Sequence, residues 1–540
     1  MFRGIVIVVC ATALIPARAA AQEHQHGSEK LGEVHFVTSC SPGAQKEFDR
    51  AVALLHSFQF NHAIQGFNAA LKSDSACVIA YWGIALSQWS NPFAVGIKEK
   101  SQLQAGRESA EKGQAAGAKT ERERAYIAAV AKLYADFDGT PQQKRLLAYR
   151  DAMETVAAKY PEDHEAQIFY ALALAASEEP TDQAHASRLK AGAILEKLFQ
   201  QEPNHPGLAH YIIHTYDVPP LALRALVAAN RYSGIAPDAP HALHMPSHTF
   251  TRVGYWQDSI NSNSAAAAAS RREGQTAEEL HASDYQMYAY LQTAQDQAAR
   301  GLLESLPEIA SRFDPKVIVS GAAPPSAGYF ALAAIPARYA LERRDWKGAA
   351  DLQLHETQFP YIDAMTWFAR GLAAARLHDV AKAEESLAAL QNIRVHLEKT
   401  NERYWAGQVE IQRLEVNAWK LFAEGHKDAA LAMMKSAGDM EDGTDKSAVT
   451  PGPLAPAREL LGEMFLETKE PAKSLEQFEA TLQKEPNRFR ALYGAARAAQ
   501  LAGKSEVSRK YFGQLLKICE RGDDPARPEI LEAKRSLSTD

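Results

Sequence analysis

The sequence has few of the features that mark membrane proteins and the commonest enzyme classes. After residue 21 it has no apolar run long enough to span a bilayer, which argues against a membrane-spanning helix in the rest of the chain. It has no phosphate-binding loop, dinucleotide fingerprint, nucleophile elbow or zinc-protease signature in a suitable context. Runs of alternating apolar and polar residues are also absent, so we expect no β-sheet.

Cysteine is scarce as well. Of the four cysteines, Cys10 lies in the apolar start of the chain, which leaves Cys40, Cys77 and Cys519. In an oxidising compartment an odd number suggests one pair and one spare thiol. Cys40 and Cys77 flank the first expected helical hairpin, so we predict a disulfide between them. Three free thiols are the alternative.

The first 21 residues have the three parts of a secretory signal peptide. Arg3 supplies the positive charge, an apolar segment follows, and Ala19–Ala21 fits the small-residue cleavage rule. We therefore expect an exported protein, periplasmic or secreted, with a flexible N-terminal arm over 22–39. Loss of Arg3 and Arg18 with the signal peptide takes the formal net charge from −7 to −9, which argues against a nucleic-acid partner.

What the sequence does contain is a repeat of about 34 residues over most of 44–520. Small and aromatic side chains recur in it at fixed positions. In the first unit these are Ala51, Ala63, Phe67 and Ala70, and near the C-terminus they are Leu461, Gly462, Phe465, Phe478, Pro486 and Phe512. The pattern resembles the tetratricopeptide repeat family, whose helix–turn–helix units stack so that neighbours bury each other's apolar faces. The resemblance implies an all-α, tetratricopeptide-like helical-hairpin solenoid.

Two stretches rich in proline interrupt the repeats. Residues 313–328 also contain glycine and are predicted to link an N-terminal array, 40–312, to a C-terminal array, 329–535. The two arrays form either separate sub-arrays or one continuous superhelix. Residues 436–456 are polar, contain three prolines and are predicted to form a loop within the second array.

Two histidine pairs share one phase of this repeat. His210 and His214 are four residues apart, as are His244 and His248, and the second pair follows the first by 34 residues. Residues four apart lie on one face of a helix, and equivalent positions in stacked units lie side by side. The four imidazoles are therefore expected to point at one patch of the molecule.

The HYIIH and HMPSH segments resemble an exported bacterial subclass of the tetratricopeptide family. In the family the first helix of each unit lines a concave groove. By that resemblance the groove side carries His210, His214, His241, His244, His248, Asp217 and Arg252. A third unit, aligned with three extra residues, places His281 and Tyr285 at the positions of the histidine pairs, with Asp284 beside them.

Clustered imidazoles with few carboxylates and no thiolate suit Zn, Cu, Ni or Fe. The predicted ligands of such an ion are His210, His214, His241, His244, His248 and His281. The groups predicted to lie in the groove or to orient the ligands are Asp217, Arg252, Asp284 and Tyr285. His56 and His62 have no phased partner and are interpreted as structural, and His205, just before Pro206, is interpreted as a loop residue and not as a ligand. Pro246, between two of the predicted ligands, predicts a kinked or restarted helix.

Three functions fit these features. The favoured one is an exported scaffold that binds a ligand in its concave groove together with a transition-metal ion. A metal-free scaffold that binds a protein or peptide partner is the first alternative. A metal-dependent enzyme of unknown reaction is the second, and the sequence designates no catalytic residue for it.

Overall fold

The computed structural model describes residues 29–94 and 98–538, and all regular structure in these ranges is helical. The expected all-α class is confirmed. The predicted signal peptide, 1–21, and the first part of the predicted arm, 22–28, lie outside the described residues. Within the described ranges, no helix combines the length and apolar character that a bilayer crossing requires.

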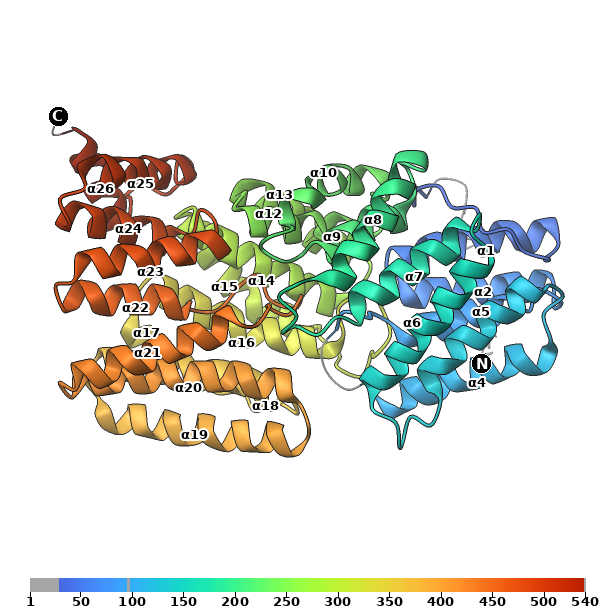
Figure 1. Ribbon diagram of the computed structural model, residues 1–540, viewed down its shortest axis with the longest axis horizontal. Helices are drawn as coiled ribbons and strands as arrows, with labels where there is room; N and C mark the ends of the chain where they lie inside the picture. Colours follow the sequence, from blue (N-terminus) through green and yellow to red (C-terminus); the bar gives the residue numbers. More distant parts are fainter. Residues whose placement is uncertain (1–28, 95–97, 539–540) are drawn as a thin grey trace, which may run out of the picture.

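The N-terminal part of the chain runs from blue to light green in Figure 1. Its helices, with two short 3-10 turns labelled η, are α1 Pro42–His56, α2 Phe60–Ser73, α3 Ala80–Trp89, α4 Lys100–Ala116, α5 Glu121–Ala131, η1 Lys132–Tyr134, α6 Gln142–Lys159, α7 His164–Ala176, α8 Ala186–Gln201, α9 Pro206–Thr215, η2 Ala222–Ala225, α10 Leu226–Ile235, α11 Pro240–His244, α12 Pro246–Val253, α13 Trp256–Arg272, α14 Thr276–Gln292 and α15 Asp296–Ser311.

The C-terminal part runs from yellow to red in the same view. Its helices are α16 Pro325–Glu342, α17 Trp346–Ala350, α18 Pro360–Arg376, α19 Val380–Lys399, α20 Arg403–Ala423, α21 Lys427–Asp442, α22 Ala457–Glu467, α23 Pro471–Lys484, α24 Phe489–Leu501, α25 Ser505–Ile518 and α26 Pro528–Ser538.

Successive helices pack as hairpins, and small residues let the hairpins approach closely. α1 packs on α2, α13 on α14, α22 on α23 and α24 on α25. Phe478 of α23 lies between two glycines, and a Cβ added to Gly494 or Gly462 would come within 2.3 or 3.0 Å of its ring. Phe67 packs against Gly83 in the same way, and a Cβ added to Gly83 would come within 2.3 Å of the Phe67 ring. These contacts join the repeated aromatic and small positions of the sequence, which makes the array a tetratricopeptide-like helical-hairpin solenoid.

The described part of the predicted flexible arm, 29–39, is packed against the first hairpins. Phe36 is fully buried, with its ring centroid 5.3 Å from that of Phe48, 5.2 Å from Trp82 and 5.1 Å from Tyr126. The Phe36 amide also donates a hydrogen bond to Asp49, at 3.0 Å. The structure differs here from the loose arm expected, because one aromatic anchor buries enough surface to hold a polar segment.

The array continues without a break through the predicted linker, 313–328. α14 packs directly on α16, which begins inside that segment.

Arg488, just before α24, contacts residues from earlier parts of the chain. It forms buried ion pairs with Glu342 and Glu459, each at 2.8 Å, and donates a hydrogen bond to Tyr288, at 3.0 Å. The two predicted arrays therefore share buried contacts.

The segment between α21 and α22, residues 443–456, is called the covering loop below. It reaches across to the central helices of the N-terminal part (Figure 1). Tyr285 of α14 donates a hydrogen bond to the Ala448 carbonyl, at 2.9 Å. Lys446 lies 3.4 Å from the Asp217 carboxylate, and Arg338 of α16 donates to the Thr450 hydroxyl, at 2.7 Å. The covering loop thus fills space that an open concave groove would leave to a ligand.

A disulfide joins Cys40 to Cys77 across a separation of 37 residues, and Cys519 is a buried free thiol. Closing a loop of this length stabilises the folded state by about 4 kcal/mol in the chain-entropy account.

We expect a Cys40→Ser, Cys77→Ser variant to melt at a lower temperature than the wild type in calorimetry. A reductant should lower the melting temperature of the wild type only; equal sensitivity in the variant would contradict this role.

Two neighbouring carboxyl groups, on the buried Glu415 and the half-buried Glu441, make stability depend on pH. Burial, and next the neighbouring Glu441, raises the pKa of Glu415 well above its usual value, and burial raises the pKa of Glu441 to about 7. A folded state that holds these protons more tightly than the unfolded chain loses stability as pH rises from about 4.5 through about 7.

We expect the melting temperature of the wild type to fall between pH 5 and pH 8, and that of Glu415→Gln to fall less, because this side chain carries no charge to bury. Glu385→Gln, at an exposed position of α19, is the matched control and should follow the wild type. Parallel curves for the wild type and Glu415→Gln would contradict the assignment.

Candidate metal centre

Six histidines from three neighbouring units lie together in the middle of the molecule, and each is between 0% and 7% exposed. Helix α9 supplies His210 and His214, α11 supplies His241 and His244, α12 supplies His248, and α14 supplies His281. α11 ends at His244 and α12 begins at Pro246, so the helix restarts between the second pair of histidines. The restart leaves His248 on the cluster side, with its ring centroid 5.0 Å from that of His244.

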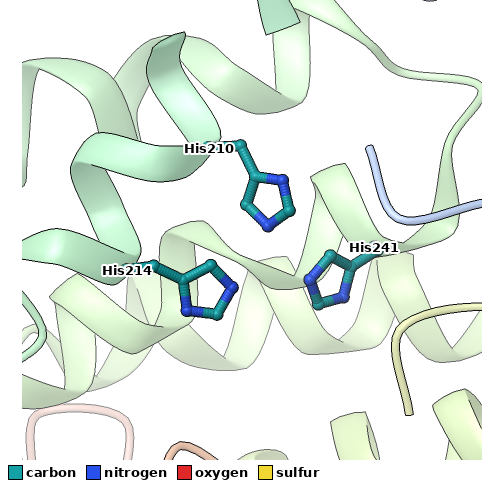
Figure 2. A group of neighbouring side chains, drawn as sticks. All are labelled: His210, His214 and His241. Atoms are coloured by element: carbon teal, nitrogen blue, oxygen red, sulfur yellow. The ribbon is translucent and has the colours of Figure 1, made fainter. Parts of the chain in front are cut away.

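The six side chains form two groups of three, not one group around a single point. His210, His214 and His241 make the first triad, and His244, His248 and His281 make the second. Within each triad, one nitrogen from each ring lies within 4.8 Å of the other two. Figure 2 shows the first triad, with two rings from one helix facing the third across a shared space.

In the first triad, two of the rings are held by oxygen acceptors on Nδ1. His210 Nδ1 lies 2.6 Å from the His56 carbonyl, and His241 Nδ1 lies 2.6 Å from a carboxylate oxygen of Glu278. Burial would raise the pKa of Glu278, but His241 and the Ala323 amide hold that pKa below its usual value. Each Nδ1 therefore donates a proton, and in the neutral form of either ring the lone pair is on Nε2.

The Nε2 atoms of the first triad are all buried. Those of His210, His214 and His241 have no hydrogen-bond partner within residues 29–94 and 98–538. Burial, and next the neighbouring imidazoles, lowers the pKa of His210 and of His214 well below the usual value. The rings of His210 and His214 are therefore neutral at physiological pH, and the unpartnered Nε2 atoms of all three rings face one space (Figure 2).

The second triad has the same kind of support. His244 Nδ1 lies 2.7 Å from the Asn263 side-chain oxygen, and His248 Nδ1 lies 2.9 Å from an Asp217 oxygen. The Asn263 amide is oriented by its NH2 group, which donates to the Ser259 carbonyl at 2.8 Å. The Nε2 atoms of His244 and His248 face each other at 3.0 Å.

Asp217 is a buried carboxylate beside the cluster. Burial would raise its pKa, but Lys446 and Arg252 hold that pKa well below its usual value. Arg252 Nε donates to Asp217 at 2.8 Å, and Lys446 approaches it from the covering loop. Burial lowers the pKa of Lys446 to about 8. Of the two residues predicted to lie in the groove or to orient ligands here, Asp217 thus contacts His248, and Arg252 contacts Asp217.

Asp284 and Tyr285, the other two residues predicted to lie in the groove or to orient the ligands, have different partners. Asp284 is fully buried and pairs with Arg338, at 2.7 Å, instead of with a histidine. Tyr285 lies beside His248, with its hydroxyl 3.3 Å from Nδ1. Burial raises the pKa of Tyr285 well above its usual value, so its hydroxyl stays protonated and donates to the covering loop.

One small pocket, of about 40 Å³, reaches both triads. Its histidine lining is His214 and His241 from the first triad and His248 and His281 from the second. Phe93, Ala322–Ala327, Trp405 and the covering loop supply most of the remaining wall. At the histidines, segments far away in the sequence thus cover much of the space where the sequence predicted a concave groove.

A third cluster lies next to the first triad. Glu165 bridges His56, at 2.9 Å, and His205, at 3.1 Å. Burial would raise the pKa of Glu165, but these two imidazoles hold it well below its usual value. His205 was interpreted as a loop residue; it is 2% exposed and precedes the first residue of α9. The His56 carbonyl joins this cluster to His210.

Four groups of the centre were not predicted from the sequence: Glu278, Asn263, Glu165 and Lys446. Glu278 precedes His281 by three residues, as His241 precedes His244, so the repeat itself contained a signal for it. Asn263 and Glu165 come from packing helices that have no distinctive motif. Lys446 arrives from a loop more than 200 positions away, which no local pattern indicates.

Comparison with known proteins gives a limited result. No family model matches the chain, and no curated protein matches it. Solved structures are similar at low scores. The P58(IPK) TPR domain is 14% identical, with 69% of this chain and 98% of that chain covered and a TM-score of 0.21. The human IFIT1 dimer with m7Gppp-AAAA is 11% identical, with 82% and 90% covered and a TM-score of 0.36.

The Cut9 and Hcn1 hetero-tetramer of the APC/C is 12% identical, with 92% of this chain and 90% of that chain covered and a TM-score of 0.34. At such identities and scores these proteins indicate nothing about the ligand of this chain. Its class, a tetratricopeptide-like solenoid, follows from its own helical hairpins and their aromatic-to-glycine contacts.

The Arg338–Asp284 pair anchors α14 and the covering loop, and it yields a prediction about stability. Arg338→Met would leave the Asp284 carboxyl buried without its cation, a change that typically costs about 3–5 kcal/mol. Arg271→Met removes an exposed pair with Glu308 and should cost less than about 1 kcal/mol. Urea unfolding measures both changes. Equal stability of the two variants would show that the buried pair has no special role.

Proposed function

We propose that this protein is an exported, tetratricopeptide-like metal-binding protein, whose first triad, His210, His214 and His241, holds a transition-metal ion. The observation that supports the proposal most directly is the set of three buried Nε2 atoms that lack a hydrogen-bond partner in the described part of the chain. Two of the rings have their tautomer fixed by an acceptor on the opposite nitrogen. Such an acceptor behind a metal-bound imidazole is the usual arrangement in metal sites.

A purely structural role accounts for this arrangement poorly. Each buried polar atom left without a partner costs about 1–3 kcal/mol, and three of them face the same space. Protonation would not relieve the cost, because burial and the neighbouring rings lower the pKa of His210 and of His214. A divalent ion satisfies all three lone pairs at once, with bonds of about 2 Å to each nitrogen.

The donor set narrows the choice of ion. Three imidazole ligands suit Zn, Cu, Ni or Fe. Among the described cysteines, Cys40 and Cys77 are bonded to each other, and Cys519 belongs to a separate hydrophobic cluster in the C-terminal helices. Three protein ligands leave a coordination position for water or a small molecule, and the pocket beside His214 and His241 gives room for it.

The location and the partners belong to the same proposal. Residues 1–21 support export to the periplasm or beyond, and a Cys40–Cys77 disulfide is typical of an oxidising compartment. Because the covering loop and Trp405 enclose the histidines, a protein partner would bind the outer helical surfaces and not the ions. A metal-dependent enzyme is the second candidate, favoured by the pocket that reaches both triads.

The test is metal content, measured by elemental analysis of protein purified without a histidine tag. We expect His214→Gln, His241→Gln to lose about one ion per chain relative to the wild type, since two of three ligands are gone. The matched control is His355→Gln, His396→Gln, which changes two exposed histidines. Unchanged metal in the first variant, or no metal in the wild type after exposure to Zn, Cu, Ni and Fe, would favour a metal-free interaction scaffold.

A further inference from the structure

We infer that the second triad, His244, His248 and His281, holds its own metal ion, so that the protein has a two-metal centre with a shared pocket. This inference extends the proposed function from one ion to two. It rests on the division of the histidines into two triads, on the tautomers of the second triad and on the pocket between them.

Two rings of the second triad, His248 and His244, have a tautomer fixed by their hydrogen bonds. Asp217 carboxylate oxygens only accept hydrogen bonds, so His248 Nδ1 donates to Asp217 at 2.9 Å. The Asn263 oxygen is also an acceptor, fixed in place by the amide's bond to Ser259, so His244 Nδ1 donates to it at 2.7 Å. Both Nε2 atoms of these neutral rings then carry lone pairs.

These two lone pairs face each other at 3.0 Å, and lone pairs at that distance repel unless something positive lies between them. A shared proton would use two nitrogens only. His281 brings a third ring to the same place, 4.6 Å from His244 between ring centroids. An ion is the occupant that satisfies three imidazoles at once.

The spacing suits an ion. With bonds of about 2.0–2.1 Å, two nitrogens 3.0 Å apart subtend an angle of about 94° at the metal. That angle lies near the 90° of adjacent octahedral or square-planar positions, and a small opening of the pair gives the tetrahedral value. His244 and His248 therefore need little movement to bind an ion together.

The two triads are built alike. In each triad one ring donates to a carboxylate, His241 to Glu278 and His248 to Asp217. A second ring in each donates to a neutral oxygen: His210 to the His56 carbonyl, and His244 to the Asn263 amide.

The third ring of each triad, His214 in the first and His281 in the second, lines the shared pocket. Both triads have the same kinds of acceptor and both face the shared pocket. Two ions explain this likeness more simply than one ion in the first triad and a purely structural role for the second.

The size of the pocket limits the ligand that such a two-metal centre could bind. The ring centroids of His214 and His248 are 5.7 Å apart, as are those of His241 and His244, so the triads adjoin each other. A space of about 40 Å³ holds only a few water-sized groups. The ligand shared by the two ions is therefore a molecule of a few atoms, such as water, hydroxide or a small inorganic anion.

The test is titration of the metal-free wild type with Co(II), followed by the visible absorbance of the bound ion. We expect the absorbance to rise until about two equivalents per chain have been added. His248→Gln, His281→Gln and His214→Gln, His241→Gln should each stop at about one equivalent. Circular dichroism checks that each variant is folded, and the wild-type titration does not depend on any variant.

The outcomes separate the two claims. Saturation of the wild type at one equivalent, with the second-triad variant unchanged, overturns the second site and leaves the proposed function intact. Two equivalents in both the wild type and the second-triad variant also overturn it, because the second ion would then bind elsewhere. An unchanged first-triad variant instead contradicts the proposed function at its own site.

Discussion

The candidate metal centre depends on the hydrogen-bond acceptors that fix the orientation of its buried imidazole rings. A ring with both nitrogens free would rotate and would lose about 1–3 kcal/mol for each unsatisfied atom. Four of the six rings therefore have a fixed acceptor behind them: the His56 carbonyl, Asn263, Glu278 and Asp217. These acceptors lie on α1, α13 and α14 and just after α9. The stacking of several repeat units is thus what orients the cluster.

The sequence predicted the parts of this arrangement that repeat. Small and aromatic positions 34 residues apart predicted the helical hairpins, and Phe478 between Gly462 and Gly494 shows why such positions recur. The same phase placed His210 and His214 next to the following pair. It did not indicate that the six histidines divide into two triads. That division depends on ring orientation, which is fixed by acceptors outside the repeat pattern and by the helix restart at Pro246.

Long-range contacts explain what the sequence did not predict. A polar stretch with three prolines indicates a loop but not where the loop lies, and residues 443–456 lie over the histidines. Lys446 reaches Asp217 across more than 200 positions of sequence. As a result, the histidines line a small pocket of about 40 Å³ whose wall includes this loop.

The third repeat unit differs from the first two at the positions of the histidine pairs. Where the first two units have a histidine pair, this unit has His281 and Tyr285, and where the second unit has His241 it has Glu278. Glu278 accepts a hydrogen bond from His241. Tyr285 stays protonated, because burial raises its pKa well above the usual value, and its hydroxyl bonds the covering loop. A helical position that carries an imidazole in the first two units therefore carries, in the third, the hydroxyl that bonds the covering loop.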